Sequence, residues 1–240
     1  MAIFFLDKDP VFPPATLAEG NGLLAIGGDL SPQRLLEAYS RGIFPWFSNG
    51  DPLLWWSTDP RLVLRPEWLH VPGSLKKVIK RGVFNITYDR AFNEVIAACA
   101  RARRPEGAGT WITREMKSAY IRLHKLGYAH SVEAWIPGVD GVSKLVGGLY
   151  GVALGGCFFG ESMFHDQPDA SKVAFATLVT DLQRWGFSII DCQMTTQHLL
   201  RFGAREISRD EFLAILARVR LHGVSAGSWQ VSRDTCPTNP

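Results

Sequence analysis

The sequence lacks the long apolar run that would place the chain in a membrane. Of its 240 residues 46% are hydrophobic, yet no stretch of 18 consecutive apolar residues occurs, and a membrane-spanning helix needs about that length. The first seven residues are too few and too acidic for a signal peptide. We therefore expect a cytoplasmic globular protein with no membrane partner, large enough to bury a core in one or two domains.

Cysteine is scarce, and its spacing fits neither a zinc site nor a disulfide framework. The four cysteines, Cys99, Cys157, Cys192 and Cys236, form no CxxC pair. Three of them lie in apolar segments, where a thiol usually behaves as a small hydrophobic side chain. This pattern is typical of a reducing compartment and of a protein without structural zinc.

Phosphate-binding loops are also missing. The segment Asn21–Asp29 contains a Gly-Gly pair, but the chain has neither GxGxxG nor GK[ST]. Those motifs carry the glycines and the lysine that cradle nucleotide phosphates. A bound nucleotide of these common types is therefore not expected.

Charge is spread unevenly along the chain. The net charge is only +3, but residues 1–60 carry three basic and seven acidic residues, a net of −4, so the remainder carries +7. Much of this excess comes from Lys76, Lys77, Lys80, Arg81, Arg101, Arg103 and Arg104. Clusters of this kind are usually solvated helix faces, yet a one-sided excess also suits a partner with a phosphate backbone.

Two carboxylates stand in otherwise apolar segments that read as strand ends. Glu161 lies within residues 158–164, and Asp191 lies within residues 189–193. Dehydrating a carboxylate costs several kcal/mol unless it is paired or hydrogen-bonded. The two residues are candidates for a polar site in an apolar pocket. The alternative for either one alone is a capped, partly exposed acid.

The order of the elements predicts an α/β protein whose mixed sheet is covered by helices. Ser31 and Pro32 begin a helix that ends at Gly42. Further helix-like segments are residues 74–80, 90–103, 114–126, 171–185 and 209–221, and strand-like segments are 84–88, 129–136, 144–154, 156–161 and 187–192. We predict a small, irregular N-terminal domain over 1–60 and a larger domain over 61–240, with a loosely ordered tail at 225–240.

A set of motifs in a fixed order identifies a family. They are Asn21-Gly22-Leu23-Leu24-Ala25, Gly27-Gly28-Asp29-Leu30-Ser31, Arg41-Gly42-Ile43-Phe44-Pro45-Trp46-Phe47, Trp55-Trp56-Ser57, Asp59-Pro60-Arg61, Gly109-Thr110-Trp111-Ile112-Thr113, Gly160-Glu161-Ser162-Met163-Phe164, Ala170-Ser171-Lys172 and Asp191-Cys192-Gln193. Together they resemble the leucyl/phenylalanyl-tRNA–protein transferases, bacterial aminoacyltransferases of the N-end rule pathway. The resemblance covers about residues 3 to 230.

The resemblance implies a fold, a reaction and its partners. The larger domain would have a GNAT-like fold. Leu, Phe or Met would pass from aminoacyl-tRNA to a protein whose N-terminal residue is Arg or Lys, marking that protein for degradation. No cofactor and no metal are implied, and nothing in the sequence demands more than a monomer.

The resemblance also assigns roles at the two carboxylates. Asp191 and Gln193 would bind the attacking amine and accept or guide its proton. They are two residues apart, so they point to one face as long as the strand stays extended. Glu161 would lie close by and suit an incoming Arg or Lys side chain. Cys192 is expected in the core and not as a nucleophile, because no histidine lies in a partnering motif.

The substrate tRNA requires other residues. By resemblance, Trp46 and Trp111 would stack on the terminal adenosine, although they could instead knit the two domains together. The aminoacyl side chain would enter a pocket formed by Leu149, Phe175, Leu178 and Leu182. Taken alone, the helical spacing of the last three indicates only a core stripe.

Two rival functions stay open at this point. One is a GNAT acetyltransferase that uses acetyl-CoA, although residues 159–164 put an acid where that fold binds pyrophosphate. The other is a tRNA-binding module without catalysis, which leaves Glu161 and Asp191 without a role.

Overall fold

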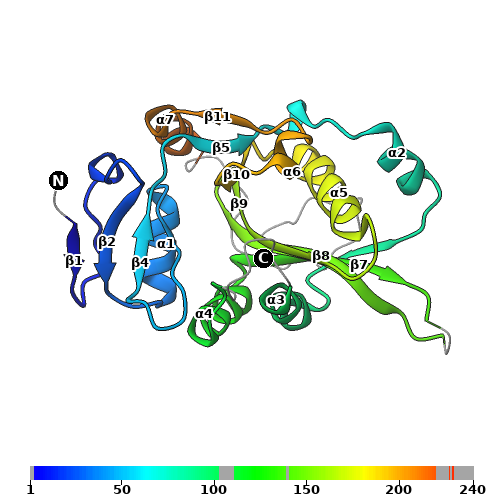
Figure 1. Ribbon diagram of the computed structural model, residues 1–240, viewed down its shortest axis with the longest axis horizontal. Helices are drawn as coiled ribbons and strands as arrows, with labels where there is room; N and C mark the ends of the chain where they lie inside the picture. The colour runs from blue at the N-terminus through cyan, green and yellow to red at the C-terminus, as the bar shows by residue number, and fades with distance from the viewer. Residues whose placement is uncertain (1–2, 103–110, 139–140, 220–226, 228, 230–240) are drawn as a thin grey trace.

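The computed structural model describes residues 3–102, 111–138, 141–219, 227 and 229, and these are organised around two separate sheets. Figure 1 shows the smaller sheet at one end of the molecule and the larger one through its middle. The predicted fold class is confirmed: two mixed sheets are covered by helices, in a small N-terminal unit and a larger domain.

The N-terminal unit is more regular than predicted. It contains a four-stranded sheet in the order β1-β2-β4-β3, so the expectation of an irregular unit was wrong. Its elements are β1 (Phe4–Leu6), η1 (Ala15–Leu17), β2 (Leu23–Gly27), α1 (Pro32–Ser40), β3 (Phe44–Pro45) and β4 (Leu54–Trp56). Each strand has five residues or fewer, which is too short for alternation to reveal it.

Helix α1 begins and ends as its sequence predicts. The Ser31 hydroxyl accepts a hydrogen bond from the Arg34 N–H, and Pro32 occupies the first turn. Gly42 follows the helix with φ +71°, and a Cβ there would lie 2.8 Å from a methyl carbon of Leu213. The buried face of α1 includes Tyr39, which is thereby directed toward the larger domain.

The larger sheet has seven strands in the order β11-β5-β10-β9-β8-β7-β6. The strands are β5 (Arg61–Leu64), β6 (Asn85–Tyr88), β7 (Ala129–Ile136), β8 (Lys144–Leu154), β9 (Cys157–His165), β10 (Ile189–Gln193) and β11 (Arg205–Ile207). All neighbours are antiparallel except β9 and β10, which run parallel. Parallel strands need a crossover, and α5 (Ala170–Arg184) provides it.

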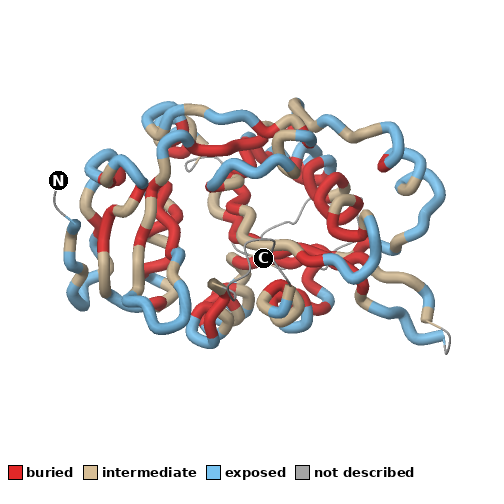
Figure 2. The backbone as a smooth tube through the Cα atoms, viewed as in Figure 1, coloured by how far each residue is buried: buried red, intermediate tan, exposed pale blue. Residues whose placement is uncertain are grey.

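Helices cover both faces of the larger sheet (Figure 1). The remaining helices are η2 (Pro66–Trp68), α2 (Gly73–Lys80), α3 (Phe92–Arg101), α4 (Arg114–Lys125), α6 (Gln197–Leu200) and α7 (Arg209–Val219). One buried cluster joins the N-terminal unit to α3 and α4, and a second lies beneath α5. Figure 2 shows these buried segments between the exposed outer surfaces. None of the described helices combines the length and the apolar character needed to cross a bilayer.

The predicted helices of this domain are all present, with ends shifted by one or two residues in most cases. Their capping residues explain this agreement. Thr113 accepts a hydrogen bond from the Met116 N–H, and Ser208 accepts one from the Glu211 N–H. The prediction missed β5, β11 and α6, which have only three or four residues each.

Two β-bulges lie where β9 and β10 separate. Their parallel pairing ends at Asp191 and Phe159. In the β8–β9 pairing Tyr150 faces Ser162 while Gly151 faces Gly160, so Glu161 is the extra residue of a bulge. The pairing of β10 with β5 skips Cys192 in the same way. Bulges re-aim side chains and are common beside active sites.

Part of the predicted tail can be located. Trp229 is only 2% exposed, and its N–H donates to Asp89, whose carboxylate also contacts His130. The indole ring stacks on the His130 ring at 4.0 Å between centroids. The other tail residues, except Gly227, lie outside the described residues.

Candidate active site

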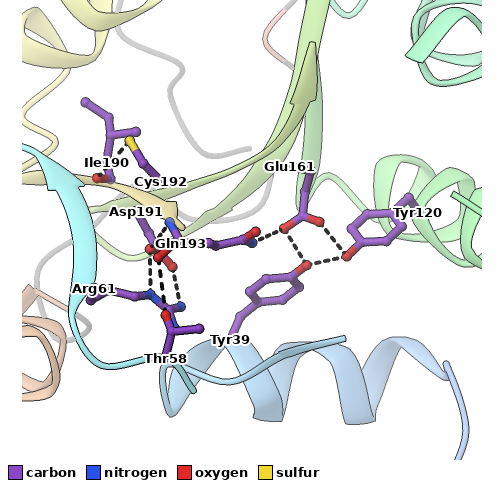
Figure 3. A network of polar contacts seen from close by, with 9 residues as sticks. All are labelled: Tyr39, Thr58, Arg61, Tyr120, Glu161, Ile190, Asp191, Cys192 and Gln193. Atoms are coloured by element: carbon purple, nitrogen blue, oxygen red, sulfur yellow. Dashed lines mark hydrogen bonds and ion pairs between the residues drawn. The ribbon is translucent and has the colours of Figure 1, made fainter. Parts of the chain in front are cut away.

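Glu161 lies at the centre of a polar network formed by four elements (Figure 3). Its Oε1 accepts hydrogen bonds from the Tyr39 hydroxyl at 2.7 Å and from the Gln193 Nε2 at 2.9 Å. Its Oε2 accepts one from the Tyr120 hydroxyl at 2.9 Å. The bulge in β9 turns the carboxylate toward α1 and α4, so three donors converge on it.

The environment of Glu161 brings its protonation into the neutral range. Burial raises the pKa of the carboxyl to about 7, the nearby Asp191 charge adds to the rise, and the hydrogen bonds from Tyr39, Tyr120 and Gln193 oppose it. A half-buried carboxylate with no cation paired to it among the described residues behaves in this way because low polarity disfavours its charged form. At neutral pH the protonated and ionised forms therefore coexist.

The two tyrosines contact each other as well as Glu161. Their hydroxyl oxygens lie within hydrogen-bond distance, and both side chains are fully buried. Burial, followed by the adjacent Glu161 charge, holds the pKa of each phenol well above its ordinary value. Both hydroxyls therefore stay protonated and act as donors.

Asp191 is held in a buried ion pair that the sequence did not reveal. The Arg61 Nε donates to its Oδ1 at 2.8 Å, and the Arg61 Nη2 donates to its Oδ2 at 2.6 Å. Asp191 is 0% exposed and Arg61 only 1%. The guanidinium also lies between the rings of Phe44 and Phe212, 4.7 Å from each centroid. Asp191 is thus fixed in place with its charge balanced.

Gln193 links the two carboxylates. Its backbone N–H donates to Asp191 Oδ1 at 2.9 Å, while its side chain reaches Glu161. Its carbonyl accepts a hydrogen bond from the Thr58 hydroxyl at 3.2 Å, and its φ is +61°. The prediction that Asp191 and Gln193 share one face assumed an extended strand, but the strand is interrupted by the bulge at Cys192. The hydrogen bonds from Gln193 to Asp191 and to Glu161 bring these residues together instead.

In Figure 3 the Cys192 side chain points away from Glu161, and its thiol donates a long hydrogen bond of 3.9 Å to the Ile190 carbonyl. It packs at the edge of the cluster beneath α5. Burial, with a further contribution from Asp191, raises the pKa of the thiol far above its ordinary value. A protonated thiol is a poor nucleophile, which supports the interpretation of Cys192 as a packing residue.

The two predicted adenosine-binding tryptophans lie on different parts of the chain. Trp46 follows β3, is 36% exposed, and packs edge-on against Trp56 with 5.5 Å between ring centroids. Trp111 is half-buried just before α4, at the rim of the cluster shared by the N-terminal unit and the larger domain. Each tryptophan therefore lies close in sequence to a helix that contacts Glu161. Trp46 follows α1, which carries Tyr39, and Trp111 precedes α4, which carries Tyr120.

The four predicted pocket residues are core residues in the structure. Leu149 lies on β8, and Phe175, Leu178 and Leu182 lie on α5. Each is 5% exposed or less, and all belong to the cluster beneath α5. They lie on the far side of the sheet from Tyr39 and Tyr120, which belong to the other cluster. Core packing is thus their observed state, and their role as a pocket remains a prediction.

The predicted basic residues divide between two regions. Lys76, Lys77, Lys80 and Arg81 are exposed on and just after α2, which Figure 1 shows at the opposite end of the molecule from the N-terminal unit. Arg101 is exposed at the end of α3. Arg103 and Arg104 lie outside the described residues.

Three residues of the site were not predicted. Arg61 was present in the Asp59-Pro60-Arg61 motif, but nothing in the sequence shows its partner, which lies 130 residues away. Tyr39 and Tyr120 lie on the buried faces of amphipathic helices, where an aromatic residue normally indicates core. A tyrosine on such a face must usually satisfy its hydroxyl when buried, and this was the one available signal.

This arrangement suits general acid–base chemistry. It holds one carboxyl that gains and loses a proton near neutral pH, beside a second carboxylate whose charge is compensated. A group with such a pKa is matched to general acid–base chemistry.

Comparison with known proteins agrees with this chemistry. The family model for leucyl/phenylalanyl-tRNA protein transferase matches residues 63–217, and the model for the N-terminal domain of that transferase matches residues 28–59. Proteins named leucyl/phenylalanyl-tRNA–protein transferase from Magnetococcus marinus and Syntrophotalea carbinolica are 58% and 60% identical to the chain, over 219 and 222 residues. These alignments cover 91% and 92% of this chain and 92% and 94% of the relatives. The chain belongs to the leucyl/phenylalanyl-tRNA–protein transferase family and is an aminoacyltransferase.

Proposed function

We propose that this aminoacyltransferase moves Leu, Phe or Met from tRNA to the α-amino group of proteins whose first residue is Arg or Lys. The new peptide bond marks those proteins for degradation by the N-end rule pathway. The enzyme acts in the cytoplasm as a monomer. One observation carries the substrate proposal: Glu161 is a half-buried carboxylate with no cation paired to it among the described residues, beside an Asp191 that Arg61 has neutralised.

The charges of the site favour a cationic N-terminus. Arg61 balances Asp191, so the ionised form of Glu161 leaves one negative charge uncompensated among the described groups around it. An α-ammonium group next to an Arg or Lys side chain brings the opposite charge. In surroundings of low polarity this attraction is much stronger than in water.

The reaction needs little further activation. The aminoacyl ester is already an activated acyl donor, and an α-amine has a reference pKa of about 7.7–8.0, so part of it is neutral at pH 7. Holding the amine and the ester carbon in line supplies much of the rate. We assign the alignment of the amine to Gln193, whose backbone Asp191 fixes and whose amide contacts Glu161.

The tRNA end is assigned to aromatic and apolar side chains. Trp46 and Trp111 would grip the terminal adenosine from the two parts of the chain. The aminoacyl side chain would enter between the separating ends of β9 and β10 and reach Leu149, Phe175, Leu178 and Leu182. The half-buried Met163, in register with Leu149, supports this route because it lies at the edge of the same cluster.

We also propose that the chain divides into two domains at residue 60 and that the larger one is GNAT-like. The two sheets support the boundary, since β4 ends at Trp56 and β5 begins at Arg61. The parallel pair β9 and β10, within an otherwise antiparallel sheet, supports the GNAT-like assignment. An acetyl-CoA-dependent activity is not favoured, because the similar proteins are named leucyl/phenylalanyl-tRNA–protein transferases.

The first test is the reaction itself. Wild-type protein is incubated with labelled Phe-tRNA and peptides that differ only in their first residue. Label should pass to peptides beginning with Arg or Lys and not to those beginning with Ala or Glu, because only the former bring a second positive charge to Glu161. Transfer from acetyl-CoA in place of Phe-tRNA, or equal labelling of all peptides, would contradict the proposal.

The second test concerns the Asp191–Arg61 ion pair. Asp191→Asn leaves the buried guanidinium without its counter-charge, so the protein should lose about 3–5 kcal/mol of stability. Transfer, measured below the melting temperature, should fall by about 10²-fold, the scale of a small misplacement at a reacting centre, because Gln193 is no longer aligned. Asp181→Asn is the matched control, because Asp181 is also a buried aspartate. It accepts a hydrogen bond from the Tyr88 hydroxyl on the other face of the sheet. An Asp191→Asn variant as active as this control would remove the pair from the mechanism.

The third test concerns the adenosine. Trp46→Ala and Trp111→Ala should each weaken binding of a minimal aminoacyl-adenosine by about 1–3 kcal/mol, the usual contribution of a stacked base. The two losses should not add, because both rings would contact one ligand. Trp135→Ala, which removes another half-buried tryptophan, is the control. Early melting with normal binding of the analogue would assign Trp46 and Trp111 to domain packing.

The fourth test concerns the basic residues of α2. Apparent affinity for aminoacyl-tRNA should fall as salt rises, since binding to phosphates releases counterions. Replacing Lys76, Lys77, Lys80 and Arg81 by Gln should flatten the logarithmic slope by up to about 3, because each phosphate that is no longer neutralised accounts for roughly 0.7–0.9 of it. Neutralising Lys125 and Lys144, which are exposed elsewhere, is the control. Equal slopes for both variants would show that the α2 charges face only solvent.

A further inference from the structure

Three side chains in the site form a closed ring of oxygen contacts. Tyr39 contacts Glu161 Oε1 at 2.7 Å, Tyr120 contacts Oε2 at 2.9 Å, and the two hydroxyls contact each other. The residues come from α1, β9 and α4, so the ring exists only in the folded chain. Both tyrosines are fully buried, whereas Glu161 is partly accessible.

The number of protons in this ring determines whether all three of its oxygen–oxygen contacts are hydrogen bonds. Three oxygen–oxygen contacts need three hydrogens if all are to be hydrogen bonds, and each tyrosine supplies one. The Gln193 Nε2 brings its own hydrogen to Glu161 and does not alter the balance. When Glu161 is ionised, one of the three oxygen–oxygen contacts therefore has no hydrogen. When Glu161 is protonated, its hydrogen makes the third contact a hydrogen bond as well.

We propose that Glu161 is the proton acceptor for the attacking α-amine and that Tyr39 and Tyr120 are the positioning residues that hold the accepted proton. This inference rests on the proposed function and concerns the same site. As the amine nitrogen bonds to the ester carbonyl carbon, its proton passes to Glu161. As the bond from that carbon to the ribose oxygen breaks, Glu161 returns the proton to the leaving oxygen. The products are an amide and a free hydroxyl, with no net gain or loss of protons.

Asp191 is the alternative acceptor, and its contacts argue against it. Both of its oxygens accept hydrogen bonds from the Arg61 guanidinium, and Oδ1 also accepts the Gln193 N–H. Protonating it would break a bidentate ion pair and leave a buried guanidinium uncompensated. It is also fully buried. Asp191 therefore acts through Gln193, and Glu161 is the carboxyl that a substrate amine reaches.

The surroundings of Glu161 give it a proton affinity suited to accepting a proton from the α-amine and returning it. Its pKa of about 7 lies just below that of an α-amine, so a proton moves between them with little change in free energy. The titratable and charged groups around it come from every neighbouring element. They are Tyr39 on α1, Tyr120 on α4, Tyr150 on β8, Asp191 on β10 and, paired with Asp191, Arg61 on β5.

The ring can be tested first in the free protein, without substrate. Difference infrared spectra across pH 5–9 should show a protonated carboxyl that titrates near pH 7 and is absent from Glu161→Gln. Tyr39→Phe and Tyr120→Phe each remove a donor to the carboxylate, so this titration should move to higher pH in both variants. Tyr88→Phe is the matched control, because the Tyr88 hydroxyl is also buried and bonded to a carboxylate, Asp181, on the other face. In Tyr88→Phe the Glu161 carboxyl should titrate at the same pH as in the wild type.

Transfer kinetics supply the second measurement, with aminoacyl-adenosine and two peptides whose α-amines differ in pKa. The limb of the pH profile that belongs to the amine moves between peptides, and the limb that belongs to Glu161 does not. Tyr39→Phe and Tyr120→Phe should lower kcat and shift the second limb upward, with little change in KM for aminoacyl-adenosine. Glu161→Gln keeps a complete ring of hydrogen bonds but accepts no proton, so it should stay folded and lose about 10²–10⁴-fold in transfer.

The outcomes separate this inference from the proposed function. If wild-type protein transfers the aminoacyl group but its carboxyl titration does not respond to loss of either tyrosine hydroxyl, the ring is overturned and the transferase assignment stands. Near-normal transfer by Glu161→Gln would likewise overturn the role of Glu161. If the infrared titration shifts as expected but no peptide is labelled, the proposed substrates are wrong while the ring is present.

Discussion

The ion pair between Arg61 and Asp191 is the interaction on which the rest of the site depends. Arg61 begins β5 and lies between Phe44 of the N-terminal sheet and Phe212 of α7, so its guanidinium is surrounded by two aromatic faces and one carboxylate. Without Asp191 such a burial would be strongly unfavourable. The pair therefore fixes how the N-terminal unit, α7 and β10 meet. Asp191 in turn holds the Gln193 N–H, and Gln193 holds Glu161.

Two irregularities of the sheet turn this frame into a site. Regular pleating would send Glu161 and its neighbours alternately to the two faces. The bulges at Glu161 and Cys192 break that alternation at the point where β9 and β10 separate. The polar ring then lies on the side of α1 and α4, and the apolar residues beneath α5 lie on the other. An acyl donor entering between the strands would meet an apolar wall on one side and the acid–base group on the other.

The sequence predicted the elements that carry their own local signals. Ser31 caps its helix as predicted, and Thr113 and Ser208 cap theirs in the same way, because a cap depends on residues only three positions apart. The short strands carry no such signal, and their pairing depends on distant partners. The network around Glu161 was hidden for the same reason: Tyr39 and Tyr120 are 81 residues apart, and each reads as core on its own helix. Asp191 was found as a carboxylate in an apolar segment and Gln193 by resemblance, but alternation along a strand does not predict the bulge between them.

The placement of Glu161 has a consequence for stability that follows from the same burial. Its pKa is about 7 in the folded protein, while a freely exposed glutamate in the unfolded chain titrates near 4.5. Between these values the folded state binds a proton that the unfolded state has already lost, so stability decreases as pH rises through this window. At and above pH 7 the folded protein holds an ionised, incompletely hydrated carboxylate, which lowers its stability. A neutral amide at the same position would not carry this cost. The burial that brings the Glu161 pKa near neutrality therefore lowers stability at neutral pH, as is typical of functional sites, and the buried Arg61–Asp191 ion pair holds Gln193 against this carboxyl.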